Sequence, residues 1–180
     1  MAIVELAQGH RDALLRFFEE LPEGDLTFIK EDVTDAATVR GWTAGDPEVR
    51  RWLATDRDEV CGYVAVYRMP GWSDHVGEIR LVVAPASRGT GLGRELARHA
   101  IVEGLRWGLT KLAVEVVAEQ GPALALFTGL GFSGEALLRD HIRDRKGELR
   151  DLMLLAHHVE ETWSGMGTVG LPEELGQEPG

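Results

Sequence analysis

The sequence predicts an α/β (α+β) fold with a mixed, mostly antiparallel sheet of about six to seven strands, flanked by about four helices. One observation is residues 78–118, in which an apolar strand, a glycine-rich turn, a helix and a second apolar strand follow one another. A right-handed helical crossover of this kind predicts that the two strands are parallel neighbours. A second observation is the pair of strand patterns at 132–142 and 148–159, which the hairpin turn at 144–147 joins.

Shorter patterns predict the remaining elements. Arg11–Leu21 has apolar side chains at helical spacing, which indicates an amphipathic helix. Thr34 or Asp35 can cap a second short helix, whereas the apolar residues 26–29 are compatible with either a strand or an extended linker. The other predicted elements are an edge strand at 2–5, an antiparallel pair at 49–54 and 59–68, and a short helix at 123–130.

Composition and charge limit the possible functions. At 180 residues with 44% hydrophobic content, the chain suits one globular domain, expected at 1–159, followed by an acidic Gly-, Pro- and Glu-rich tail at 160–180. The net charge of −11 argues against a nucleic-acid partner. There is no apolar run of about 18 residues, which argues against a membrane span. The single cysteine, Cys61, and the absence of a secretory signal predict a cytoplasmic protein.

The turn Arg88–Gly93 is the leading candidate for a binding site. It connects the strand at 78–84 to the helix that follows, so free main-chain N–H groups are expected at the positive end of the helix dipole. Such a helix N-terminus binds phosphate groups, and Arg88 adds a positive charge. A dinucleotide fingerprint would require a third glycine where Arg94 stands, and a Walker loop would require a Gly-Lys-Ser/Thr run, which is missing.

A different glycine pattern does fit this turn. It is Arg/Gln-x-x-Gly-x-Gly after a Val-Val-Ala-Pro strand end, and Arg88, Gly91 and Gly93 meet it. With this pattern the chain resembles the GNAT superfamily of acetyl-CoA-dependent N-acetyltransferases. Further segments are similar to the family in the same order, namely Ala123–Phe127, Leu130–Phe132 and Glu148–Met153. The resemblance covers about 1–159 and implies the GNAT fold, with acetyl-CoA as co-substrate and no metal.

The resemblance also implies which residues form the coenzyme site. A main-chain N–H near Val82 or Val83 is expected to polarise the thioester carbonyl. Gln120 stands where the family often has Asn, so an amide is retained. Phe127 stands where the family often has a tyrosine general acid, so this proton donor is missing. The candidate coenzyme-binding residues are Val82, Val83, Arg88, Gly89, Thr90, Gly91, Leu92, Gly93, Gln120 and Phe127.

Glu78 is the candidate general base. Amines of pKa about 10 arrive protonated, so a carboxylate that removes a proton is expected. Glu78 lies ten residues before Arg88, where some members of the family place their base. The alternative interpretation is a structural glutamate paired with Arg80, which faces the same side of the strand. His75 and His141 are the other acid/base candidates, and no spacing of Cys, His and Asp residues indicates a metal site.

The sequence leaves three functions open. The leading hypothesis is an N-acyltransferase that moves an acetyl group from acetyl-CoA to a primary amine by direct attack on the thioester. Phe127 motivates a second hypothesis, a non-catalytic CoA- or acyl-CoA-binding regulatory module, and a nucleotide-binding enzyme is third. The amine acceptor could be a small molecule or a peptide, and Tyr67 and Trp72 could line its site. A homodimer is common in the family, and nothing in the residues indicates one here.

Overall fold

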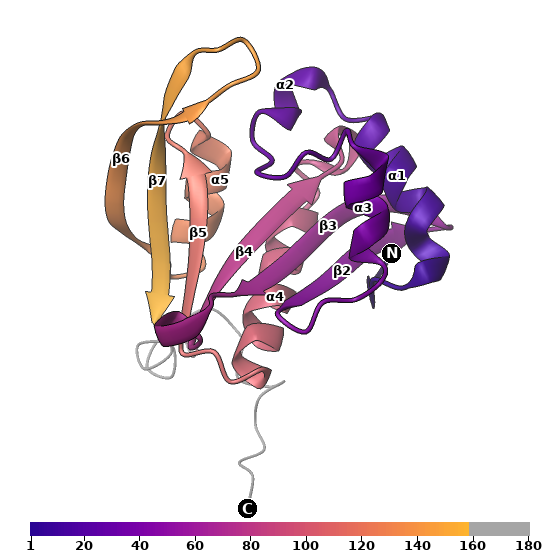
Figure 1. Ribbon diagram of the computed structural model, residues 1–180, viewed down its shortest axis with the longest axis horizontal. Coiled ribbons are helices and arrows are strands. Elements are labelled where there is room, and N and C mark those ends of the chain that lie inside the picture. The colour runs from indigo at the N-terminus through magenta and orange to yellow at the C-terminus, as the bar shows by residue number, and fades with distance from the viewer. Residues whose placement is uncertain (159–180) are drawn as a thin grey trace, which may run out of the picture.

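The computed structural model describes residues 1–158, so the predicted tail at 160–180 lies outside the described residues. Within 1–158, seven strands form one sheet in the order β1-β2-β3-β4-β5-β7-β6 (Figure 1). The strands are β1 (Ala2–Glu5), β2 (Val49–Asp56), β3 (Glu59–Arg68), β4 (Val76–Val83), β5 (Lys111–Val117), β6 (Ser133–Arg143) and β7 (Leu149–His158). The α-helices are α1 (Arg11–Glu19), α2 (Glu23–Leu26), α3 (Ala36–Trp42), α4 (Leu92–Arg106) and α5 (Gly121–Thr128). The predicted mixed α/β fold is confirmed.

The central feature of the sheet is the separation of β4 from β5. Among the strand pairs of the described sheet, this one is parallel, as the helical crossover predicts, and the other five are antiparallel. The last paired position of β4 and β5 joins Glu78 to Ala113. Beyond it, β4 continues along β3 and β5 continues along β7, while β4 and β5 diverge (Figure 1). We call the diverging segments, 79–83 of β4 and 114–117 of β5, the splay.

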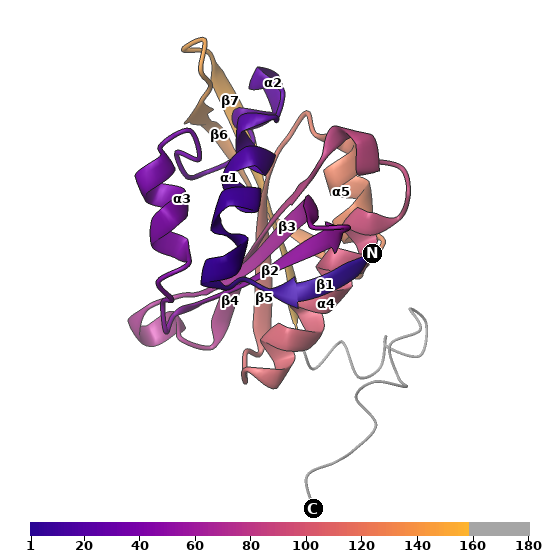
Figure 2. The ribbon, with the colours of Figure 1, turned by 90° about the vertical axis from the view of Figure 1, so that its right-hand side faces the viewer.

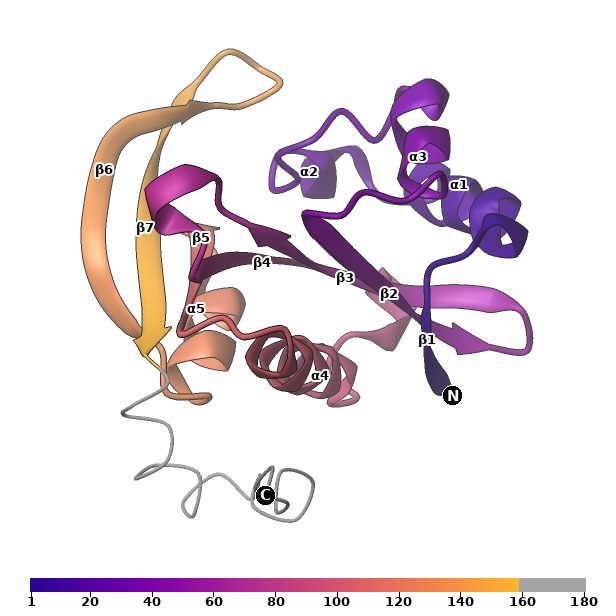
Figure 3. The ribbon, with the colours of Figure 1, turned by 60° about the horizontal axis from the view of Figure 1, so that its bottom comes forward.

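Helices cover both faces of the sheet (Figures 2 and 3). α4 and α5 lie on one face, where Leu96 and Leu112 belong to a buried hydrophobic core. α1 and α3 lie on the other face, where Leu14 belongs to a second core. Because side chains alternate along a strand, Val82 of β4 packs with the α1–α3 core and Val83 with the α4 core. No helix within residues 1–158 has the length and apolar character that crossing a membrane requires.

Local sequence signals explain where several elements begin and end. The β2–β3 hairpin turns at Arg57 and Asp58, which have φ values of 47° and 72°, as expected for a tight turn that matches the twist of its strands. Asp35 caps α3 by accepting hydrogen bonds from the N–H groups of Ala37 and Thr38, at 3.0 and 3.1 Å. Of the two predicted caps for this helix, the structure therefore uses the aspartate.

The segment between α1 and α3 differs from both alternatives that its sequence leaves open. Residues 26–29 form neither a strand nor an extended linker, because Glu23–Leu26 folds as the short helix α2 and turns follow it. Pro22 precedes this helix with φ −57°, and Glu23 and Asp25 place negative charge in its first turn. Hydrophobic periodicity needs a longer window than one turn to be detected. The described residues therefore have five α-helices instead of about four.

We expect Leu14→Ala to lower the free energy of unfolding by about 2 to 5 kcal/mol, because removing this buried side chain leaves a cavity between α1 and the sheet. Leu149→Ala is the matched control. Leu149 is 47% exposed at the start of β7, so its substitution should cost less than about 1 kcal/mol. Urea unfolding followed by circular dichroism measures both variants. Equal losses would contradict the packing of α1 against the sheet.

Candidate active site

The first turn of α4 lies beside the splay. A Cβ atom added at Gly93 would lie 3.6 Å from Cγ2 of Val83 on β4 and 3.7 Å from Cδ2 of Leu126 on α5. Gly93 therefore marks the point where β4, α4 and α5 meet, and a bulkier side chain there would push these elements apart. Gly93 is not among the glycines with positive φ, and both distances are those of ordinary van der Waals contact.

The N-terminus of α4 carries main-chain N–H groups that have no protein acceptor. Gly89 and Gly91 have φ values of 74° and 94°, and no side chain caps the helix. Within residues 1–158, the N–H groups of residues 89–93 donate no hydrogen bond, whereas those of Arg94 and Glu95 both donate to the carbonyl of Gly91. Free donors at the positive end of a 15-residue helix form a site for an anion such as a diphosphate.

Arg88 lies at the other end of this turn. Its Nε donates to the carbonyl oxygen of Val83 at 3.2 Å, and its Nη2 donates to Oδ2 of Asp25 in α2 at 2.6 Å. The side chain is 48% exposed, so the guanidinium keeps further donors for a phosphate oxygen. The ion pair between Arg88 and Asp25 also connects α2 to the turn.

The edge of β4 that faces the splay carries a second set of free donors. The N–H of Ala84 donates to the carbonyl of Cys61 at 2.9 Å, so residue 84 faces β3. Main-chain groups alternate in direction along an antiparallel pair, so Val82 also faces β3. By the same alternation, Leu81 and Val83 direct their N–H groups into the splay. Of the two main-chain groups predicted to polarise the thioester, the one at Val83 therefore has this direction.

Glu78 lies at the base of the splay, on the face of the sheet opposite to α4. It is only 7% exposed. Its carboxylate accepts hydrogen bonds from Nε and Nη2 of Arg80 at 2.7 and 3.2 Å, and Nζ of Lys30 lies 3.4 Å from each of its oxygens. The pair with Arg80 that the sequence offers as an alternative is thus present, and Lys30 adds a second cation from the segment between α2 and α3.

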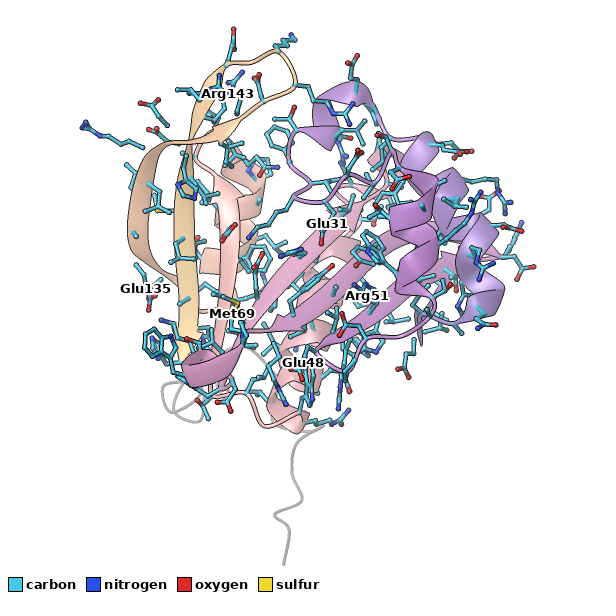
Figure 4. The ribbon with its side chains drawn as sticks, in the orientation of Figure 1. Glu31, Glu48, Arg51, Met69, Glu135 and Arg143 are labelled. Atoms are coloured by element: carbon cyan, nitrogen blue, oxygen red, sulfur yellow. The ribbon has the colours of Figure 1, made fainter. Side chains whose placement is uncertain are left out.

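Further charged side chains extend this arrangement across the splay. Nζ of Lys30 donates to Oε2 of Glu115 on β5 at 2.9 Å, and Arg80 also donates to Glu31. Glu31 lies on the same side of the sheet as α3 (Figure 4) and accepts a hydrogen bond from the hydroxyl of Tyr67 at 2.6 Å. The Arg80 guanidinium carbon lies 3.8 Å from the centre of the Tyr67 ring. We call the charged members of this group the splay cluster: Lys30, Glu31, Glu78, Arg80 and Glu115.

The splay cluster sets the protonation of Glu78. Burial by itself would raise the pKa of Glu78, but the hydrogen bonds and charge of Arg80, together with Lys30, outweigh burial and hold the pKa below the ordinary 4.5. Burial likewise opposes the charge of Arg80, yet Glu78 and Glu31 raise its pKa. Burial and the negative charge of Glu31 raise the pKa of Tyr67. At neutral pH, Glu78 is therefore ionised next to a charged Arg80, and Tyr67 is neutral.

Gln120 lies immediately before α5 and Phe127 lies within it, on the β5 side of the splay. Gln120 is the N-cap residue of α5, and its side chain makes no capping hydrogen bond. Phe127 is 5% exposed, and its ring centre lies 5.3 Å from that of Phe132 in the core shared with α4. Their contacts with the pantetheine arm stay predictions. The packing of Phe127 explains why an aromatic ring suits this position even without a hydroxyl group.

The remaining candidates lie away from the splay. The carbonyl of His75 accepts a hydrogen bond from Thr110 at 2.9 Å, at the end of β4 that still pairs with β5. His141 is exposed on β6, which β7 separates from β5. Trp72 is 97% exposed in the 3₁₀ helix η2 (Gly71–Ser73). Among residues 1–158, no group of three His, Cys, Asp or Glu side chains could hold a metal ion.

Sequence reasoning missed three members of the splay cluster, Lys30, Glu31 and Glu115. Lys30 and Glu31 follow the segment whose structure the sequence leaves open, so no periodic element places them. A signal for Glu115 is present, since it is the one charged residue inside the apolar run Leu112–Val117. A charge in such a strand needs a partner or water, and the strand alternation puts it on the face of Glu78.

Solved structures share this architecture. A ribosomal-protein-alanine N-acetyltransferase from Brucella melitensis superimposes with a TM-score of 0.78 at 22% identity, covering 88% of this chain and 99% of that chain. A Salmonella typhimurium protein solved with its cofactor acetyl-CoA gives a TM-score of 0.77 at 19% identity, covering 88% of this chain and 94% of that chain. At these identities the likeness shows the fold, and the GNAT fold predicted from the sequence is confirmed.

Sequence relatives agree with the fold. A mycothiol acetyltransferase from Amycolatopsis mediterranei is 38% identical over 129 residues, which cover 66% of this chain and 40% of the relative. A streptothricin acetyltransferase from Streptomyces lavendulae is 32% identical over 89 residues, covering 49% and 47%. The chain spans between 19% and 47% of the length of the curated relatives that it matches. A model of the acetyltransferase (GNAT) family matches residues 12–132, which include the splay and α4, so the chain belongs to this family.

Proposed function

We propose that this chain is an N-acyltransferase, which transfers an acetyl group from acetyl-CoA to a primary amine by direct attack of the amine on the thioester. One observation carries the proposal: the free N–H groups of residues 89–93 lie beside the splay, whose β4 edge presents further free N–H groups at Leu81 and Val83. A diphosphate bound at the first set and a thioester carbonyl at the second would place the acetyl group between β4 and β5.

The residues of the turn fit the diphosphate of coenzyme A. Cβ atoms added at Gly89 and Gly91 would meet no atom within 4 Å, so the turn faces open space. Arg88 adds a half-exposed guanidinium, of which Asp25 and the carbonyl of Val83 occupy one nitrogen each. The coenzyme supplies an activated acetyl thioester when bound. The chain supplies the donors that bind and orient it and a group that accepts the proton of the amine.

The splay cluster supports removal of that proton. Primary amines of pKa about 10 arrive as ammonium ions. Because its pKa lies below the ordinary 4.5, Glu78 is ionised at neutral pH, and an ionised carboxylate has the free oxygen needed to accept a proton directly or through water. The same low pKa makes Glu78 a weak base. Its carboxylate therefore keeps its negative charge, which also holds the ammonium group in place. We assign polarisation of the thioester carbonyl to the N–H of Val83.

Phe127 has no proton to give to the departing thiolate. A thiol of pKa about 8.5 leaves without much assistance near neutral pH. General acid assistance contributes about 10²- to 10⁴-fold, so its absence slows such a reaction without abolishing it. We infer that the thiolate of coenzyme A leaves unassisted and takes its proton from solvent.

We infer that the acceptor is a cationic primary amine. The splay cluster combines three carboxylates with two cations, so one negative charge is left for an ammonium group. The similar proteins are named for mycothiol, streptothricin and a ribosomal-protein alanine, so their names do not select one acceptor. Incubation with isotope-labelled acetyl-CoA and a panel of amines tests the function: release of free CoA together with a labelled amide supports it.

A non-catalytic CoA-binding module is the second candidate, which Phe127 favours because the position lacks a general acid. Tight binding of acetyl-CoA without turnover of any amine in the panel would support this candidate. Thermal-shift assays with CoA, NAD and ATP separate both from a nucleotide-binding enzyme. A ligand at 100 times its Kd adds about 2.7 kcal/mol to the stability of the protein that binds it.

Gly91→Ala should weaken acetyl-CoA binding about tenfold, because the free turn would relax away from φ 94°, and restoring its donors on binding would cost about 1 to 2 kcal/mol. Gly41→Ala in α3 is the control, since Gly41 has no positive φ and open space around its Cα, and its affinity should match that of the parent protein. Titration calorimetry measures both. An unchanged Kd for Gly91→Ala would argue against diphosphate binding at this turn.

Glu78→Gln should lower kcat by about 10²- to 10⁴-fold while acetyl-CoA binding persists, because an amide cannot accept the proton of the amine. Glu135→Gln is the matched control: Glu135 is another ion-paired strand glutamate, 2.7 Å from Nζ of Lys111 and outside the splay, so kcat should stay unchanged. Steady-state release of CoA measures both variants. Full activity of Glu78→Gln would remove this residue from the mechanism.

The stability that Glu78 contributes should depend on pH. Because its pKa in the folded protein lies below the ordinary 4.5, the unfolded chain binds this proton more tightly. The contribution is therefore present above the unfolded pKa and is lost as the pH falls through the folded pKa. Between about pH 5 and about pH 3, the melting temperature of the parent protein should fall more steeply than that of Glu78→Gln. Parallel curves in calorimetry would contradict the pKa direction.

A further inference from the structure

Lys30 places a primary amine between the two diverging strands. Its Nζ lies 2.9 Å from Oε2 of Glu115 on β5 and 3.4 Å from both oxygens of Glu78 on β4. Lys30 itself belongs to neither strand, since it lies in the segment between α2 and α3. An ammonium group held by a carboxylate from each side of the splay has the chemistry that the proposed acceptor needs.

This amine lies just before the free donors of β4 along the strand direction. Glu115 lies two residues beyond Ala113, the last residue of β5 that pairs with β4, and Arg80 lies two residues beyond Glu78. The next residue of β4, Leu81, directs its N–H into the splay. One strand residue spans about 3.3 Å, so Nζ of Lys30, which contacts both Glu78 and Glu115, lies about one to three strand residues, or roughly 3 to 10 Å along the strands, before the first free donor.

The chain has two other lysines, Lys111 and Lys146. Neither lies between the diverging strands as Lys30 does. Lys111 lies at the paired end of β5 and binds Glu135 at 2.7 Å. Lys146 lies in the turn between β6 and β7. The side chain of Lys30 is 50% exposed, so it can exchange between its carboxylate partners and the splay. Arg80 is the other cation of the splay cluster, and its guanidinium stays protonated and is no nucleophile.

We propose that Lys30 is an internal acceptor of the acetyl group, so that the chain acetylates itself at this lysine when no other amine is present. The inference rests on the proposed function. A carboxylate of the splay cluster first takes one proton from the ammonium group. The nitrogen then attacks the thioester carbon, a C–N bond forms and the C–S bond breaks. Coenzyme A leaves as a thiolate that takes up one proton, and the second proton of the ammonium group is released to water.

Acetylation would change the splay cluster. The amide of acetylated Lys30 carries no charge, so it no longer pairs with Glu78 and Glu115. Both carboxylates then lack their shared cation and can hold the ammonium group of a separate amine. Lys30 thus competes with an external acceptor before modification and ceases to do so afterwards.

Mass spectrometry tests the proposal directly. The full chain is incubated with carbon-13-labelled acetyl-CoA in the absence of amines, digested, and the acetyl label is followed at each lysine. We expect Lys30 to be labelled at least about tenfold faster than Lys111 and Lys146, because the bound thioester is held next to its nitrogen. The rate constant should be independent of protein concentration, as an intramolecular reaction requires.

Variants separate this reaction from chemical acetylation in solution. Lys30→Arg keeps the positive charge but should remove the fast label. Gly91→Ala should slow the labelling of Lys30 in proportion to lost coenzyme binding and leave the slow labelling of Lys146 unchanged. Lys146→Arg is the matched control, and the fast label at Lys30 should persist in it.

The outcomes also separate this inference from the proposed function. Turnover of external amines without fast label at Lys30 overturns the inference and leaves the function standing. Absence of acetyl-CoA binding overturns both. Equal, slow labelling of all three lysines, or a rate constant that rises with protein concentration, overturns internal acetylation as well.

Discussion

The structure depends on the early end of pairing between β4 and β5. Each strand keeps its other neighbour, so the sheet stays intact while one edge of β4 loses its acceptors beyond Glu78. Buried main-chain donors normally find a partner, so such an edge is costly unless water or a ligand binds it. The first turn of α4 reaches the same place, since Gly93 lies next to Val83 of β4 and Leu126 of α5. One break in the sheet thereby brings two sets of free donors together.

The opposite face of the splay is charged for a related physical reason. Strand alternation turns Glu78, Arg80 and Glu115 away from the α4 core, toward the layer of α1–α3. A buried carboxylate such as that of Glu78 needs cations or water, and here Lys30 and Arg80 supply the positive charge. The price is a Glu78 that is a weaker base than an isolated carboxylate. The same pairs keep it ionised, as its proposed role in binding an ammonium group requires.

Much of the fold, and the turn Arg88–Gly93 with it, could be predicted because the sequence signals for these features are local. Periods of two and of about 3.6 residues show the strands and helices, and Gly91 indicates a turn that other residues adopt only with strain. The helix α2 was missed because its four residues are too few for a period. Lys30 and Glu31 follow it, so the pair of Lys30 with Glu78 and the pair of Glu31 with Arg80 were missed too. The pair of Glu78 with Arg80 is one of the two interpretations that the sequence offers.

The sequence by itself determined the order of strand, glycine turn and helix around Arg88–Gly93, and with it the family, because these features depend on neighbouring residues. Only the tertiary structure decided which N–H groups of β4 face the splay and which charges surround Glu78. Those facts depend on contacts between residues far apart in the chain, such as Lys30 with Glu115, and on the side of β4 that pairs with β3. A sequence pattern within a single segment predicts neither the direction of these N–H groups nor the charges around Glu78.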